Sequence, residues 1–246
     1  MKVGLFVPCY IDQFFPEVGI ATLQLLEKHN CEVIFPNQQT CCGQPMANSG
    51  MEQEGKKIYH DLAYLFFSCE YIVAPSPSCV HHIRSHYDIV EQTEEIKHLR
   101  KQTFDIVEFL VDVLKIDHLE ASFPHRVGLH QSCHGLRGMH LGKPSELMSN
   151  IPSKWDKVLK MVNGIDLAML NRADECCGFG GTFAVAEEAV SVKMGKDRLA
   201  DHNQNNVEVL TSGDMSCLMH LQGIAKRQKS GPKIVHIANI LNGDQL

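Results

Sequence analysis

Short apolar runs alternate with longer amphipathic segments along the first half of the chain. The runs at residues 2–7, 32–35 and 71–74 have the length and composition of strands buried inside a sheet. The segments at 16–28 and 51–67 have the length of helices, and apolar residues recur at helical spacing in the first of them. The pattern therefore predicts the order strand, helix, strand, helix, strand.

The second half of the chain repeats this alternation. Two strands are predicted there, at 127–129 and 207–210. Residues 182–201 are predicted to form a helix with Val185, Ala189 and Val192 on one face. Strands that alternate with helices build parallel sheets through right-handed crossovers. We therefore expect an α/β fold of two pseudo-repeated Rossmann-like lobes with mainly parallel sheets.

Three stretches of the first half return in the second half in the same order. Residues 3–9 match 127–133, residues 39–43 match 174–178, and residues 75–79 match 213–217. The offsets are 124, 135 and 138 residues by subtraction, so the second copy carries small insertions. The chain is thus predicted to be two diverged copies of one cysteine-rich unit, at 1–120 and 121–246, with the junction at 116–126.

The composition limits the functions that this chain can have. It has 246 residues, 44% of them hydrophobic, and a net charge of −6 without a strong basic cluster, so we expect no nucleic-acid partner. No apolar run approaches the roughly 20 residues that a membrane span requires, and the first residues are typical of a strand rather than a signal peptide. A cytoplasmic location is therefore expected, where the ten cysteines would not form structural disulfides. Metal or redox chemistry is the leading explanation for so many thiols.

Eight of the ten cysteines fall at matching positions of the two copies. The first set is Cys9, Cys41, Cys42 and Cys79, and the second is Cys133, Cys176, Cys177 and Cys217. In each set the first and last cysteines come at or just past a predicted strand end, where α/β sheets bind ligands. We expect each set to form one metal site, against the alternative that these cysteines are small buried core residues. Cys31 and Cys69 have no counterpart in the repeat and are expected to pack in the core.

Each set contains an adjacent pair of cysteines followed by glycine. Adjacent Cα atoms lie about 3.8 Å apart, which is too close for an unstrained disulfide, and consecutive side chains diverge, which makes it awkward for both to bind one zinc ion. An iron–sulfur cluster removes this difficulty because each thiolate can bind a different iron. Gly43 and Gly178 would adopt positive φ and bring backbone N–H groups close to cluster sulfur. The pattern therefore favours an iron–sulfur cofactor, with zinc as the alternative.

The order Cys…Cys-Cys-Gly…Cys, present twice, resembles the pair of CCG cysteine-rich domains found in heterodisulfide reductases and in the iron–sulfur component of glycolate oxidase. The stretches 39–45, 132–137 and 176–183 look most like the lactate utilization protein A family, which has this length and no ferredoxin-type extension. The resemblance implies an iron–sulfur electron-transfer subunit of a system that oxidises L-lactate, or a related small 2-hydroxy acid, to pyruvate. It also implies companion subunits, one of which carries ferredoxin-like clusters.

The chain departs from the family motif at one position in each copy. The family's last element is Cys-x-x-Cys, but Ser76 and Asp214 stand at its first position here. Each site thus has four cysteines instead of five, which leaves open a four-thiolate cubane (4Fe-4S) or an oxygen ligand from Asp214. We expect the second site to be nearer the chemistry, because a carboxylate can bind iron whereas Ser76 lies between two prolines.

His134 and Arg137 are the candidate catalytic residues beside the second site. His134 would act as an acid, a base or a donor to the cluster, and Arg137 would bind a substrate carboxylate or form an ordinary surface ion pair. Because no nicotinamide motif or phosphate loop is present, a two-electron oxidation needs partner proteins. The competing function is a zinc- or thiol-based scaffold subunit without redox turnover, which the missing fifth cysteines favour.

Overall fold

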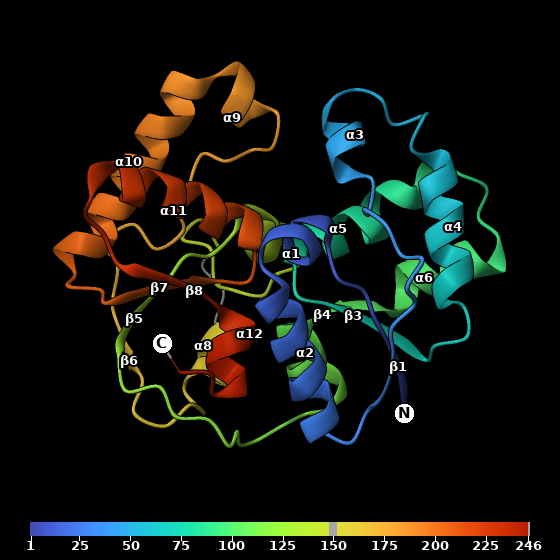
Figure 1. The fold of residues 1–246 in the computed structure, drawn as a ribbon, viewed down its shortest axis with the longest axis horizontal. Helices are drawn as coiled ribbons and strands as arrows, with labels where there is room; N and C mark the ends of the chain where they lie inside the picture. Colours follow the sequence, from blue (N-terminus) through green and yellow to red (C-terminus); the bar gives the residue numbers. More distant parts are fainter. Residues whose placement is uncertain (148–151, 246) are drawn as a thin grey trace. The chain divides into compact units, whose positions relative to one another are not determined.

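The structure, a computed structural model, describes residues 1–147 and 152–245. The chain divides into two compact units, Met1–Lys115 and Ile116–Leu246, which we call the first and the second unit. Each unit contains its own four-stranded sheet (Figure 1). Every strand pairing in both sheets is parallel. The predicted α/β class with Rossmann-like, mainly parallel lobes is therefore confirmed.

The first unit is the blue-to-green part of Figure 1, and its strands follow the order β2-β1-β3-β4. These strands are β1 (Lys2–Leu5), β2 (Glu32–Ile34), β3 (Tyr71–Ala74) and β4 (Thr103–Asp105). The helices are α1 (Cys9–Phe14), α2 (Pro16–Lys28), α3 (Gln44–Asn48), α4 (Lys56–Phe66), α5 (Pro77–His86), α6 (Glu94–Gln102) and α7 (Ile106–Glu108). Most residues of β1 and β3 are buried, as in sheets that helices cover on both faces.

Capping residues determine where several helices of the first unit begin. Helix α2 occupies the predicted range, with Pro16 at its first position. Helix α6, which the apolar pattern did not reveal, begins after Thr93, whose hydroxyl accepts a hydrogen bond from the Ile96 N–H at 3.4 Å. The helix predicted at 51–67 begins later, at Lys56, because a turn precedes it.

Helix α5 is held against strand β4 by Arg84. The Arg84 Nε donates a hydrogen bond to the Thr103 carbonyl oxygen at 2.7 Å, and the guanidinium pairs with both carboxylate oxygens of Glu108, at 2.8 and 3.1 Å. Such a two-pronged pair fixes orientation as well as distance. It therefore positions the helix that carries Cys79.

The second unit repeats this topology with the strand order β6-β5-β7-β8. Its strands are β5 (Arg126–Leu129), β6 (Asp166–Leu167), β7 (Val209–Ser212) and β8 (Lys233–His236). Its helices are α8 (Lys154–Leu159), α9 (Phe183–Ala186), α10 (Glu188–Gln204), α11 (Met215–Gln228) and α12 (Ile237–Asn242). In both units the first strand lies between the second and the third, which is the arrangement expected of a duplicated unit. Among the described residues, no helix has the length and apolar character needed to cross a membrane.

The helix predicted at 182–201 differs in two ways from the observed one. It is broken at Glu187 into the short α9 and the longer α10. The predicted apolar face is wrong, because Val185 is 85% exposed and Ala189 is also exposed. The buried side of α10 consists mostly of small and polar residues: Ser191, Gly195, Arg198, Leu199, Asp201 and His202. Apolar periodicity cannot reveal a helix that buries polar side chains.

Candidate metal centres

Each unit gathers its four repeated cysteines at the carboxyl edge of the sheet. In the first unit, Cys9 begins α1 soon after β1, and Cys79 lies in the first turn of α5, which follows β3. In the second unit, Cys133 follows β5 and Cys217 lies in the first turn of α11, which follows β7. Parallel strands end at the same edge of a sheet, so cysteines that follow neighbouring strands are brought together there.

The four thiols of each unit form a row in the same order. The Cys9 and Cys41 sulfur atoms lie 3.7 Å apart, Cys41 contacts Cys42, and Cys42 contacts Cys79. The row of the second unit runs Cys133, Cys176, Cys177, Cys217 through the same three contacts. The structure thus brings together all four members of each predicted set. Cys31 and Cys69, expected to be packing residues, are buried.

The glycine after each pair holds the first thiol of that pair. Gly43 and Gly178 have φ of 85° and 86°, in the left-handed region that favours glycine. Their N–H groups point at the sulfur atoms of Cys41 and Cys176, each at 3.3 Å. A Cβ at Gly43 would lie 2.6 Å from the Tyr59 ring. Neither backbone conformation nor space therefore allows a side chain there.

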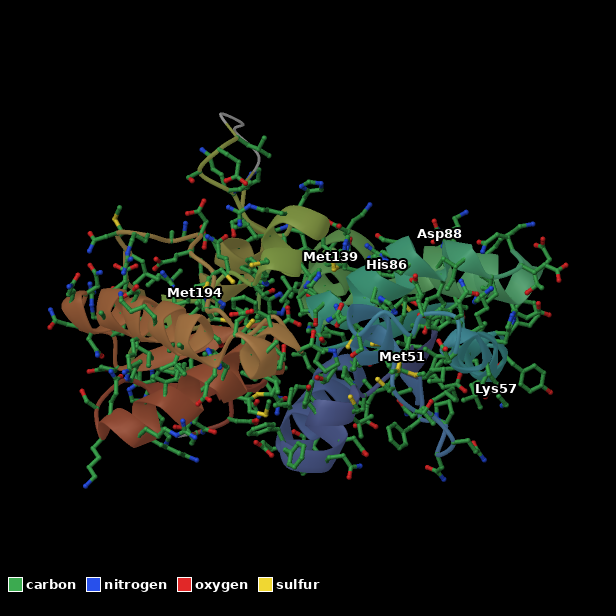
Figure 2. The ribbon with its side chains drawn as sticks, turned by 90° about the horizontal axis from the view of Figure 1, so that it is seen from above. Met51, Lys57, His86, Asp88, Met139 and Met194 are labelled. Atoms are coloured by element: carbon green, nitrogen blue, oxygen red, sulfur yellow. The ribbon has the colours of Figure 1, made fainter. Side chains whose placement is uncertain are left out.

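A Cβ at Gly178 would lie 2.7 Å from both the Ser191 carbonyl oxygen and the Met194 Cβ. Met194 is labelled on α10 in Figure 2. The Ser191 hydroxyl also donates a hydrogen bond to the Gly178 carbonyl oxygen at 2.8 Å. Helix α10 therefore packs directly against the cysteine loop of the second unit and supports its turn.

Polar side chains, the half-buried Gln39 and the buried Asp201, anchor the loop that leads to each cysteine pair. In the first unit, the Gln39 amide accepts from the Val7 N–H at 2.8 Å and donates to the Leu5 carbonyl oxygen at 3.2 Å. In the second unit, the buried Asp201 carboxylate accepts from the N–H groups of Asn171 and Arg172, at 3.1 and 3.0 Å. These bonds connect each cysteine loop to a regular element, so the thiols do not rely on a free loop for their position.

The thiols within each row differ strongly in acidity. Contacts with Cys42 and Cys9 lower the pKa of Cys41 to about 3, and contacts with Cys133 and Cys177 lower that of Cys176 to about 2. The Gly43 and Gly178 N–H groups act in the same direction. The pKa values of Cys42 and Cys133 are raised in turn, first because their thiols hydrogen-bond to Cys41 and Cys176, and further because both thiols are desolvated and a second negative charge beside the first is unfavourable. Four converging thiols therefore need positive charge before all can ionise, and a metal centre supplies it.

Aromatic residues surround the thiol row of the first unit. The Tyr87 hydroxyl donates to the Cys42 carbonyl oxygen at 2.9 Å. The Tyr59 ring stacks on Tyr87 with ring centres 3.9 Å apart, and its hydroxyl lies 3.3 Å from the His82 Nε2. Burial raises the pKa of Tyr59 to about 12, so both phenols stay neutral. These contacts pack the Tyr59 and Tyr87 rings against the cysteine pair of the first unit.

A buried histidine, His130, lies beside the thiol row of the second unit, and a buried arginine and a second buried histidine accompany it. His130, Arg198 and His202 are each 0% exposed. A ring nitrogen of His130 and the sulfur atoms of Cys177 and Cys217 all lie within 4.8 Å of one another. Burial, followed by the charge of Arg198, lowers the pKa of His130 to about 3 and that of His202 to about 2. Both imidazoles are therefore neutral in the folded chain, and His202 also has the neutral His130 as a neighbour.

Sequence reasoning did not propose His130 as a functional residue, although a signal was present. The stretch Val127-Gly128-Leu129-His130 matches Val3-Gly4-Leu5-Phe6, so a histidine stands where the other copy has phenylalanine. A polar residue at the end of a buried strand is unusual.

The other predicted site residues stand at the starts of the helices or turns that neighbour the cysteines in sequence. Asp214 is buried and occupies the position before α11, but it is not a member of the compact group formed by His130, Cys177 and Cys217. His134 is half-buried at the start of a π-helical turn, His134–Gly138. Ser76 caps α5, with its hydroxyl 3.5 Å from the Cys79 N–H. The roles assigned to these residues stay predictions.

Arg137 has carboxylate partners within the chain. Its Nε donates to Glu146 at 2.6 Å, a second nitrogen donates to Glu146 at 3.1 Å, and Asp174 lies at 3.4 Å. The guanidinium is exposed, and its two-pronged face is taken by Glu146. This arrangement is the surface ion pair that stood as the alternative to a substrate clamp.

Comparison with known proteins agrees with this geometry. The family model of the cysteine-rich domain CCG matches residues 3–84 and 127–222, once in each unit. These two matches include all eight cysteines of the thiol rows. Fold and cysteine geometry therefore define a protein with a tandem pair of cysteine-rich domains.

Relatives with this pair of domains match the chain along nearly its whole length. Lactate utilization protein A of Halalkalibacterium halodurans is 37% identical over 246 residues, which cover 98% of this chain and 97% of the relative. Its namesake in Oceanobacillus iheyensis is 38% identical over the same shares. The chain belongs to the lactate utilization protein A family. Among solved structures, a putative Asp/Glu racemase from Yersinia pestis aligns over 98% of this chain and 96% of its own, with a TM-score of 0.39 and 10% identity, a likeness too distant to bear on function.

Proposed function

We propose that the chain is an iron–sulfur electron-transfer subunit of a multi-protein system that oxidises L-lactate, or a related 2-hydroxy acid, to pyruvate. The observation that carries the proposal is the row of four thiols, built twice on the same backbone with a glycine N–H on the first thiol of each pair. The substrate class comes from the relatives, which bear the name lactate utilization protein A.

The donor set of each row suits a polynuclear centre. Neighbouring thiols of one cysteine pair contact each other, and the outer thiols come from two separate strand–helix junctions. A centre with several irons can accept such thiolates on different metal atoms and supplies the positive charge that the row lacks. When bound, it would accept and release single electrons. Hydrogen bonds from backbone N–H groups to sulfur, as Gly43 and Gly178 make to their cysteines, raise the reduction potential of such centres.

The role of the chain would be to pass electrons between proteins. Oxidation of a 2-hydroxy acid removes two electrons, and the sequence contains no recognised site for a nicotinamide acceptor. Companion subunits, one of them with ferredoxin-like clusters, would bind the substrate or receive the electrons. We place this system in the cytoplasm.

Metal analysis of protein purified without oxygen tests the proposal. We expect a brown preparation that contains iron and acid-labile sulfide in similar amounts. A colourless preparation with stoichiometric zinc would instead support the scaffold function. The compact group of His130, Cys177 and Cys217 gives that second candidate one specific argument, because two thiolates and an imidazole are common zinc ligands.

A reconstitution experiment tests the subunit model separately. The isolated, iron-loaded chain should show no lactate-dependent dye reduction, and addition of its companion proteins should restore it. Robust turnover by the isolated chain would refute the model in which partners carry the substrate chemistry.

A further inference from the structure

We propose that His130 supplies a nitrogen ligand to the metal centre of the second unit, beside the thiolates of Cys177 and Cys217. The two centres would then differ in kind, with thiolates alone in the first unit and thiolates plus one imidazole in the second. The inference rests on the proposed function in so far as it requires a metal centre.

The three donor atoms are already close. The His130 ring nitrogen and the two sulfur atoms lie within 4.8 Å of one another. They come from three separate segments of the chain: the residue after β5, the cysteine loop and the first turn of α11. Metal bonds of about 2.3 Å to sulfur and about 2.0–2.1 Å to nitrogen hold the donors of one metal ion within roughly 4 Å of each other. Small side-chain movements would therefore be enough for all three to bind the same metal atom.

The His130 ring is buried, and its nitrogens are unsatisfied within the described part of the chain. It is 0% exposed, and neither ring nitrogen has a hydrogen-bond partner among the residues that the structure describes. A buried polar group left without a partner is unfavourable, so such groups are rare unless something satisfies them.

The position in the first unit that corresponds to His130 shows which kind of side chain fills this place when packing is its only role. The Phe6 N–H donates to the Val73 carbonyl oxygen at 2.9 Å, and the His130 N–H donates to the Thr211 carbonyl oxygen at 2.7 Å. The two residues therefore hold the same place at the end of the first strand of their sheets, and Phe6 is also 0% exposed. An apolar ring fills the place in the first unit, so packing does not explain an imidazole in the second.

Replacing His130 with the residue of the other copy gives a direct test. Full-length wild-type protein, His130→Phe and the control His202→Phe are made with ¹⁵N-labelled histidine, loaded without oxygen and analysed for iron, zinc and sulfide. His202 is an equally buried histidine whose ring nitrogens also lack partners among the described residues, but it is not in the compact donor group. Pulsed EPR of the reduced iron centres, or X-ray absorption at the zinc edge if zinc is found, then detects a bound imidazole.

We expect a strong histidine nitrogen signal in the wild type and in His202→Phe, and its loss in His130→Phe. Loss of the nitrogen ligand should also lower the reduction potential of one centre and leave the other unchanged, because imidazole ligands raise the potential of iron–sulfur centres. Full iron and sulfide without a histidine signal, or a signal that survives in His130→Phe, would overturn this inference alone. Wild-type protein that binds no metal would overturn both the inference and the proposed function.

Discussion

Replacing two glycines of the first unit separates the effect of backbone conformation from the effect of crowding at the thiol row. Gly43 and Gly50 both adopt positive φ, of 85° and 75°. A Cβ at Gly50 would meet no atom within 4 Å, whereas a Cβ at Gly43 would lie 2.6 Å from the Tyr59 ring. Tyr59 is fully buried and stacked on Tyr87, so it cannot move aside freely. Gly50→Ala is therefore a matched control for Gly43→Ala.

The expected loss of stability follows from these contacts. An alanine in the left-handed region costs about 1–2 kcal/mol, and this applies to both variants. Overpacking of a closely packed site adds about 1–3 kcal/mol, and this applies to Gly43→Ala alone. We therefore expect the free energy of unfolding to fall by about 2–5 kcal/mol in Gly43→Ala and by about 1–2 kcal/mol in Gly50→Ala.

Urea unfolding of the metal-free chain measures this difference without a contribution from metal binding. The near-ultraviolet circular dichroism of the folded protein gives a second measurement, because the stacked Tyr59 and Tyr87 must shift in Gly43→Ala and not in Gly50→Ala. Equal losses of stability in the two variants, with equal spectra, would refute the explanation based on contact with Tyr59. The iron content of Gly43→Ala should also fall, because its N–H group no longer holds the Cys41 sulfur in place.

Three further predictions concern ligand identity, the difference between the sites and acid stability. Cys177→Ser should remove the iron of one centre, whereas Cys69→Ser should change stability by on the order of 1 kcal/mol and leave the iron content unchanged; the same iron loss in both would show the ligand assignment to be wrong. Asp214→Ala should alter the absorption spectrum or reduction potential of one centre, whereas Ser76→Ala should lose a helix cap of about 1 kcal/mol and keep both spectra; equal spectral effects would remove the predicted asymmetry. Burial lowers the pKa of His202 to about 2 in the folded chain, whereas the pKa of an unfolded histidine is about 6.5. The contribution of the neutral ring to stability is therefore complete above pH 6.5. Below pH 6.5 the unfolded chain binds a proton that the folded chain does not, so the free energy of unfolding falls by about 1.4 kcal/mol per pH unit. The unfolding free energy of His202→Gln, measured between pH 6.5 and 5, should therefore depend less on pH than that of the wild type, and identical slopes would contradict a neutral buried ring.

The elements that bury apolar side chains were predictable from the sequence. The strand at Tyr71–Ala74 and the helix at Pro16–Lys28 occupy their predicted ranges, because uniform or periodic apolar residues dominate both. Strand β6 was missed because two residues, Asp166 and Leu167, are too few to form a pattern. Helix α5 was missed because it begins within a Ser-Pro-Ser stretch that is typical of a turn, although Pro77 and Ser76 also suit a helix start.

The cysteine sets were predictable because the two copies of the repeat can be compared with each other within one sequence. The same comparison placed Gly43 and Gly178 in equivalent turns, and both have the positive φ that was expected. The polar surroundings of the second site were not predictable, because Arg198 and His202 lie on a helix whose buried face is not apolar. Charged residues are normally assigned to the surface, and only the folded structure shows that Asp201 pairs with Arg198 in the interior.

The common strand order of the two units makes each copy a natural reference for the other. Where the copies agree, as at the glycine after each cysteine pair, the backbone leaves no choice of side chain. Where they differ, as at Phe6 and His130, the same backbone accepts chemically unlike side chains. Residues exchanged between copies are therefore the least disruptive substitutions for engineering this chain. A library built from such exchanges would vary the environment of one thiol row while the frame that holds it stays constant.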